Sequence, residues 1–164
     1  MKILGIDPGT ATTGFGVIEK TKGKFVTIDY GVISTPKTLP MSNRLLILFN
    51  DIEEIIAKYR PELIAVEQLF FARNVTTALT VGQARGVILL AAQKADLSLK
   101  EFTPLQVKQS VTGYGQASKK QVQAMVQKIL KLKDIPKPDD AADALAIAIC
   151  ASANNQIKKN MMFY

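Results

Sequence analysis

The stretch KILGIDPGTATTGFGVIEKTKGKFVTIDYGVIS, residues 2–34, decides the fold because it contains three segments that each favour a β-strand. The first is a short apolar run typical of a buried strand, and the other two alternate apolar and polar side chains; they span residues 2–7, 14–20 and 25–34. Turn-forming residues separate them at residues 8–10 and 21–24. We therefore expect three consecutive strands that pair as antiparallel neighbours.

The remainder of the chain alternates strand and helix patterns. Two more strands are expected, at residues 62–67 and 97–103. Five helices are expected at residues 42–59, 75–95, 104–113, 118–132 and 140–153, with N-caps at Ser42, Asn74, Thr103, Ser118 and Asp139. This order predicts one α/β domain over residues 1–155, a five-stranded mixed β-sheet flanked by α-helices, followed by a short basic tail at residues 156–164.

The composition excludes several kinds of active site. The 164 residues include no His and one Cys, so a Ser-His-Asp triad, zinc sites built on His or several Cys, and an internal disulfide are excluded. Acid–base or metal chemistry must rely on other groups, and carboxylates favour hard cations such as Mg²⁺ and Mn²⁺. The chain starts without the pattern of a secretory signal and has no apolar run of about 20 residues, so we expect a soluble, cytoplasmic protein.

Positive charge is concentrated in one part of the chain. The net charge is +7, but residues 68–137 contain eleven basic and three acidic side chains and so carry +8 on their own. Residues 1–67 are balanced, with eight charges of each sign, and residues 138–164 carry −1. Such a distribution is typical of a surface that binds a polyanion, although a solvated lysine-rich face would show the same pattern.

Four carboxylates lie where a shared site can form. Asp7 and Glu67 each end a predicted strand, and Asp140 and Asp143 lie three residues apart on one face of the last predicted helix. Asp143 lies in an otherwise apolar run, where a carboxylate is costly unless it is paired or binds a cation. In a chain without His, the four acids together indicate a site for two hard cations, which suits phosphoryl chemistry.

Each acid also has a simpler explanation on its own. Asp7 suits an Asx-turn before the Pro-Gly that follows it, and Glu67 suits a solvated strand end. Asp139 and Asp140 both suit the positive end of a helix dipole. We interpret Asp139 as the N-cap of the last helix and not as a metal ligand.

Five segments of the chain carry a family resemblance. In sequence order they are GIDPGTATTGFGVIE (5–19), AVEQLFFARN (65–74), the segment ending GQARGVIL (78–89), TPLQVKQSVTGYGQASKKQVQAMV (103–126) and DDAADALAIAI (139–149). Together they span nearly the full chain, and the set is far more specific than any one of its members. On these segments the sequence resembles the RuvC family of Holliday junction resolvases.

The resemblance implies a ribonuclease-H-like fold and a homodimer that presents two active sites to a four-way DNA junction. It implies that Asp7, Glu67, Asp140 and Asp143 are the catalytic acids and bind Mg²⁺, two ions per subunit, with Mn²⁺ as a substitute. The family's D-A-A-D spacing leaves Asp139 outside the ligand set. The implied reaction is a pair of symmetric nicks that leave 5′-phosphate and 3′-hydroxyl ends, with a branch-migration helicase complex as a partner.

The resemblance also implies DNA contacts beside the acids, at Phe70, Arg73, Asn74, Lys108, Lys119 and Lys120. Exposed rings at Phe70 or Phe71 could stack on unpaired bases, and Phe71 is the better candidate for a core residue. Lys119 and Lys120 follow Ser118 at a predicted helix start, where backbone N–H groups and an ammonium group can meet one phosphate. The sequence alone does not separate the two lysines.

Two other functions fit part of the sequence. The Asp-x-Gly-Thr at residues 7–10 also resembles the phosphate loop of actin-like ATPases and sugar kinases, which need a second domain that 164 residues do not supply. A junction-binding protein without catalysis is the other alternative, and the presence of all four acids argues against it.

The helix predicted at residues 75–95 is apolar nearly all round in its second half, VILLAA. This pattern is typical either of a helix central to the monomer or of one that covers a subunit interface. We take this helix as the candidate dimer interface.

Overall fold

The computed structural model describes residues 1–68 and 75–153 of the chain. Its strands are β1 (Lys2–Asp7), β2 (Thr12–Thr21), β3 (Lys24–Ser34), β4 (Leu63–Glu67) and β5 (Ser98–Phe102). Its helices are α1 (Met41–Tyr59), α2 (Val75–Lys94), α3 (Pro104–Thr112), α4 (Lys119–Leu130) and α5 (Asp139–Ala153). None of the described helices combines the length and the apolar character needed to cross a bilayer.

The strands form one mixed sheet in the order β3-β2-β1-β4-β5, which confirms the predicted architecture. β1, β2 and β3 pair as an antiparallel meander, with Lys22 and Gly23 at positive φ in the turn between β2 and β3. β4 pairs in parallel with β1, and β5 pairs in parallel with β4. Because parallel strands end at the same edge of a sheet, the last residues of β1 and β4, Asp7 and Glu67, lie on neighbouring strand ends.

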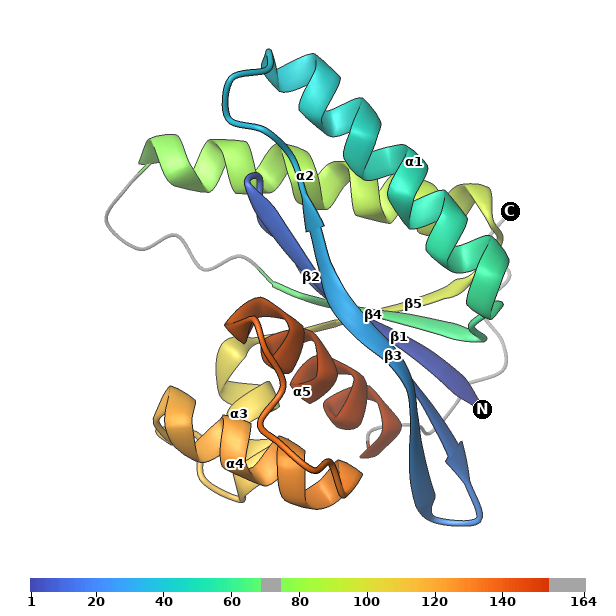
Figure 1. Ribbon diagram of the computed structural model, residues 1–164, viewed down its shortest axis with the longest axis vertical. Helices are drawn as coiled ribbons and strands as arrows, with labels where there is room; N and C mark the ends of the chain where they lie inside the picture. Colours follow the sequence, from blue (N-terminus) through green and yellow to red (C-terminus); the bar gives the residue numbers. More distant parts are fainter. Residues whose placement is uncertain (69–74, 154–164) are drawn as a thin grey trace, which may run out of the picture.

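Helices cover both faces of the sheet. α1 and α2 lie over one face, and α5 lies on the other with α3 and α4 beside it (Figure 1). Alternate residues of β1 enter the two layers: Ile3 packs on the α5 side, whereas Leu4 and Ile6 pack beneath α1 and α2. The central strands are therefore buried on both faces, which explains why they read as continuous apolar runs.

Glycines in β1 and β2 allow α5 to lie directly on the sheet. A Cβ at Gly5 would overlap the backbone carbonyl oxygen of Ala144, and a Cβ at Gly14 would overlap that of Asp140. A Cβ at Gly16 would lie 2.8 Å from a methyl carbon of Leu145. The helix and the strands thus approach more closely than any side chain permits, and this contact holds the first turns of α5 next to the end of β1.

The helix starts confirm two of the predicted N-caps and correct two. Thr103 and Ser118 each form a complete capping box at the start of α3 and α4. The prediction for Ser42 is wrong, because α1 begins one residue earlier after Pro40 and has no side-chain cap. The prediction for Asp139 is also wrong, because α5 already includes this residue in its first turn.

Candidate active site

The candidate site is built at the edge of the sheet where β1 and β4 end. Burial and then the charges of Glu67, Asp143 and Asp140 raise the pKa of Asp7 to about 8. Burial and then the charge of Asp143 raise the pKa of Glu67 to about 7, against the opposing charge of Lys108. Both carboxyl groups are half-buried, so neither is the freely solvated strand end that Glu67 could have been.

The other two predicted acids reach the same place from α5. Its first turns carry Asp140 and Asp143, and the close approach of Gly14 to the backbone of Asp140 holds them against β2, where Gly14 is paired with Asp7. Burial raises the pKa of Asp143 above its usual range, although Lys119 acts in the opposite direction. The structure therefore brings all four predicted acids into one electrostatically coupled cluster, which we call the acidic cluster.

Two of the predicted lysines border the acidic cluster. The ammonium Nζ of Lys119 lies 2.9 Å from Oδ2 of Asp143 and 3.4 Å from Oδ2 of Asp139. Burial acts to lower the pKa of Lys119, but its hydrogen bond to Asp143 and the nearby negative charges outweigh burial and raise it. Lys108, on α3, is half-buried and lies within electrostatic range of Glu67.

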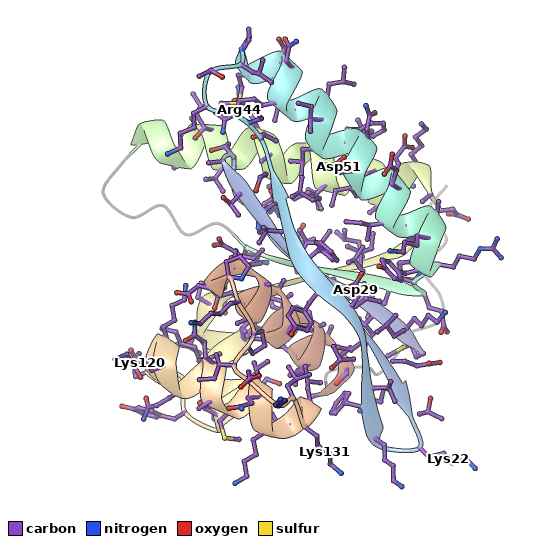
Figure 2. All side chains as sticks on the ribbon, viewed as in Figure 1. Lys22, Asp29, Arg44, Asp51, Lys120 and Lys131 are labelled. Carbon is purple, nitrogen blue, oxygen red and sulfur yellow. The ribbon has the colours of Figure 1, made fainter. Side chains whose placement is uncertain are left out.

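Lys120 occupies a different position from its neighbour. It is exposed and projects from the outer side of α4 (Figure 2). The sequence alone did not distinguish the positions of the two lysines. In the structure Lys119 contacts the acidic cluster and Lys120 does not. Asp139, which the sequence left beside the ligand set, is exposed and pairs with Lys119.

The chemistry of the acidic cluster fits a hard divalent cation. The pKa values of Asp7, Glu67 and Asp143 are raised, so these carboxylates gain from a shared cation, and oxygen ligands suit Mg²⁺ and Mn²⁺. Among residues 1–68 and 75–153, no three acidic side chains already converge on one point as ready-formed metal ligands would. Asp143 is turned instead to the ammonium of Lys119.

The turn after Asp7 is held by a residue that the sequence analysis did not single out. Arg44 of α1 donates from Nη2 to the carbonyl oxygen of Thr10 at 2.6 Å and from Nε to the hydroxyl of Thr35 at 3.0 Å (Figure 2). The Thr35 hydroxyl donates to the same carbonyl oxygen. No pattern could have revealed this group, because its members come from three separate parts of the sequence.

The predicted DNA contacts at Phe70, Arg73 and Asn74, together with Phe71, fall outside the described residues. The basic tail predicted at residues 156–164 also lies outside them, as does the predicted cap Asn74 of α2. The predictions for these residues stay predictions.

The raised pKa values predict that stability depends on pH when no metal is bound. Asp7 and Glu67 hold protons in the folded protein up to pH values near 8 and 7, whereas in the unfolded chain they lose them near pH 4. The folded state binds more protons between these limits, so this contribution to stability is fully present below about pH 4 and is lost as the pH rises toward 8.

Asp7→Asn removes the larger of these two effects, so in EDTA the variant should become more stable than the wild type as the pH rises from 5 to 9, by about 2–4 kcal/mol at the upper end. Urea unfolding of both proteins across this range measures the difference. A difference in unfolding free energy that stays constant with pH would contradict the assignment of a raised pKa to Asp7.

Comparison with known proteins gives three consistent matches. A family model described as Crossover junction endodeoxyribonuclease RuvC matches residues 3–151. The Crossover junction endodeoxyribonuclease RuvC of Heliobacterium modesticaldum is 60% identical over 152 residues, which cover 93% of this chain and 94% of the relative. A solved structure of Thermus thermophilus RuvC superposes with a TM-score of 0.85 at 38% identity, over 93% of each chain.

A second solved structure bears on the DNA. Thermus thermophilus RuvC in complex with a Holliday junction substrate also has a TM-score of 0.85, at 35% identity and with 93% of each chain covered. The five-stranded mixed sheet with helices on both faces is thus the ribonuclease-H-like fold that these nucleases share.

Proposed function

Because the chain belongs to the RuvC family of crossover junction endodeoxyribonucleases, we propose that it resolves four-way DNA junctions by hydrolysing phosphodiesters at the acidic cluster, with Mg²⁺ held by Asp7, Glu67, Asp140 and Asp143. The observation that carries the proposal is the electrostatic coupling of Asp7 to Glu67, Asp143 and Asp140 at one sheet edge, with Lys108 and Lys119 beside them. Family membership makes the ATPase alternative wrong.

The proposed roles of the acids and the lysines follow from their opposite charges. Bound Mg²⁺ supplies Lewis-acid activation of water and neutralises charge on the phosphate, and Mn²⁺ has the same preference for oxygen ligands. The four carboxylates would hold the metal, and Lys108 and Lys119 would position the phosphodiester by charge, for hydrolysis that leaves a 5′-phosphate and a 3′-hydroxyl. A cation held by Asp143 would compete with the Lys119 ammonium, which lies 2.9 Å from Oδ2 of Asp143, and the ammonium would then be available to a phosphate.

The basic half of the protein supplies the DNA surface. α3 and α4, which carry Lys108 and Lys119, belong to the segment of net charge +8. Both helices lie beside α5 on one side of the sheet (Figure 1). The Ser118 side chain caps the backbone N–H of Gln121, which leaves the N–H groups of Lys119 and Lys120 for a phosphate at the start of α4. Phe70, Arg73 and Asn74 complete the proposed DNA surface.

The proposal is tested by nicking of a synthetic four-way junction. We expect paired nicks with Mg²⁺ or Mn²⁺, none in EDTA, and at least about 100-fold slower cutting of a linear duplex of the same sequence, because the site is selective for junction shape. Ligation of the products by DNA ligase checks for 5′-phosphate and 3′-hydroxyl ends. Cutting that persists in EDTA would contradict the metal assignment, and equal cutting of the linear duplex would contradict junction selectivity.

The homodimer is the second part of the proposal, and α2 is its proposed interface. One face of α2 packs on the sheet through Ala84 and Ile88, which are fully buried. On the other face Leu79 and Leu90 are 65% and 60% exposed. Eleven residues amount to about three helical turns, so these two leucines share one apolar stripe. A second copy that covers this stripe would place two active sites in one particle. The branch-migration complex stays a prediction from the family.

Leu90→Glu should convert the dimer into a monomer, because it places an unpaired charge in the proposed apolar interface. Sedimentation velocity measures the change in mass, and Val26→Glu provides the control, since Val26 is 56% exposed on the β2–β3 hairpin, away from α2. A Leu90→Glu protein that sediments as the wild-type dimer would exclude α2 as the interface.

A further inference from the structure

A pocket beside Glu67 is not used by the proposed chemistry. Its volume is about 470 Å³, and its lining consists of Thr103, Pro104, Leu105, Lys108, Gly115 and Gln116. We propose that this pocket receives a nucleobase unstacked from the strand being cut, and that Leu105 and Gln116 determine which base is accepted. The inference rests on the proposed function, because the base belongs to the strand whose phosphate lies at the acidic cluster.

The pocket adjoins the acidic cluster through the end of β5. Glu67 pairs with Phe102 in the sheet. Gln68, which directly follows β4, donates its N–H to the carbonyl oxygen of Phe102 at 2.8 Å. The pocket wall starts one residue later, at Thr103. Lys108 belongs to the pocket lining and also acts electrostatically on Glu67. A nucleotide next to the scissile phosphate is therefore within reach of the pocket.

The wall of the pocket is already ordered by hydrogen bonds. Gln109 donates from its side-chain amide to the carbonyl oxygen of Gly113 at 2.8 Å, and the Thr112 hydroxyl donates to that of Tyr114 at 2.9 Å. The Ala117 N–H donates to the Tyr114 carbonyl oxygen at 3.1 Å. These bonds fix the loop between α3 and α4, so a ligand finds a pre-formed wall and need not order one.

The lining has the chemistry that a nucleobase requires. Leu105 is 55% exposed although it is apolar, and with Pro104 it offers a surface on which a planar ring can lie. A Cβ at Gly115 would lie 3.1 Å from Cγ of Leu105, so the loop backbone packs closely against this side chain. Gln116 is exposed and lines the pocket. One amide offers both a donor and an acceptor to a base edge.

The charge of the pocket points to a nucleic acid and not to a cationic ligand. Its lining contains one ammonium group, from Lys108, and no carboxylate. This ammonium suits the phosphate attached to the bound nucleotide, while the apolar wall suits the base. A volume of about 470 Å³ accommodates a base with its sugar and lies within the range of small-ligand pockets, about 300–1,000 Å³.

Unstacking can be measured directly with 2-aminopurine placed, in separate junctions, at each nucleotide that flanks the cleaved phosphate. Asp7→Asn protein prevents cutting during the measurement. We expect 2-aminopurine fluorescence at one of these positions to rise severalfold on binding, because the lining contains no aromatic ring to quench it. The rise should be lost in Asp7→Asn/Leu105→Ala and retained in Asp7→Asn/Leu46→Ala, since Leu46 is 60% exposed on α1.

Cleavage rates test whether the pocket selects among the four bases. Each of the four bases is placed in turn at the position where 2-aminopurine fluorescence rises. The cleavage rates of the wild-type protein on these four junctions should differ by about tenfold or more, as expected for hydrogen-bonded base recognition. In Gln116→Ala and Leu105→Ala these rates should converge to within about twofold, whereas Leu46→Ala keeps the wild-type spread. Junction affinity in Ca²⁺ serves as the measure of intact binding.

The inference is overturned if 2-aminopurine stays quenched at every flanking position, or if both pocket variants keep the wild-type spread of rates. Either outcome leaves the proposed function standing as long as the wild-type protein cuts junctions in Mg²⁺. Failure of the wild-type protein to cut any junction would instead overturn the proposed function. A fluorescence rise that Leu105→Ala does not change would place the unstacked base outside this pocket and would also overturn the inference.

Discussion

Asp7→Asn protein is expected to bind four-way junctions as tightly as the wild type and to cleave them at least about 10³-fold more slowly, because a metal-bound transition state is worth several kcal/mol. Asp7 lies at the centre of the acidic cluster: the charges of Glu67, Asp143 and Asp140 all act on it. Asparagine keeps the shape of the side chain but removes the charge that holds a cation. The substitution also relieves repulsion in the folded protein, so the loss of activity cannot come from unfolding.

Single-turnover cleavage in Mg²⁺, together with junction affinity in EDTA, separates the two effects. Asp139→Asn is the matched control, because Asp139 lies four residues before Asp143 and pairs with Lys119, yet it is exposed and outside the proposed ligand set. This variant should lose at most a few-fold in rate, as expected for removal of an exposed ion pair. Cleavage by Asp7→Asn at close to the wild-type rate, or an equal loss in both variants, would contradict the proposed ligand set.

Gly14→Ala is expected to have the second-largest effect, on stability and cleavage together. Its Cβ would overlap the carbonyl oxygen of Asp140, so α5 must move away from β2. Overpacking of this kind costs about 1–3 kcal/mol of unfolding free energy, or more where backbone atoms are displaced. The shift also moves Asp140 and Asp143 relative to Asp7, and a displacement of about 1 Å in a catalytic group can lower the rate by about 100-fold.

Urea unfolding and single-turnover cleavage at a temperature where the variant is still folded measure the two losses separately. Gly31→Ala is the control, because it adds the same methyl group to the neighbouring strand, where its Cβ would lie 3.1 Å from the ring of Phe15, a side chain that can rotate aside. Gly31→Ala should cleave at close to the wild-type rate. If the folded Gly14→Ala protein also did so, the packing of α5 would not determine the position of the acids.

Most of the fold could be predicted because its local patterns agree with its tertiary structure. The buried strand Lys2–Asp7 and the antiparallel meander follow from hydrophobic periodicity, and Thr103 and Ser118 are capping residues with the expected partner three residues later. Ser42 shows the limit of such reasoning. It is a good capping residue by type, but Pro40 already supplies the helix start and α1 begins before Ser42.

The candidate site likewise has features that the sequence could predict and features that it could not. The placement of the four acids could be predicted because strand ends and a three-residue helical spacing are local features, and the family resemblance was confirmed, whereas their catalytic role stays a prediction. The pairing of Lys119 with Asp143, the bond from Arg44 to Thr10 and the pocket at Leu105 could not, because each depends on how separate segments meet in space. The metal, the homodimer and the helicase partner stay predictions.

The direct contact between α5 and the glycines of β1 and β2 has a consequence for how the protein opens. At Gly5, Gly14 and Gly16 no strand side chain separates the backbone of this helix from the sheet, so at these positions α5 cannot shift by a small amount without losing the contact. Undocking the helix exposes the core residues beneath it and disperses the acidic cluster in the same event. We therefore expect undocking of α5 and loss of the acidic cluster to occur together, as one opening event.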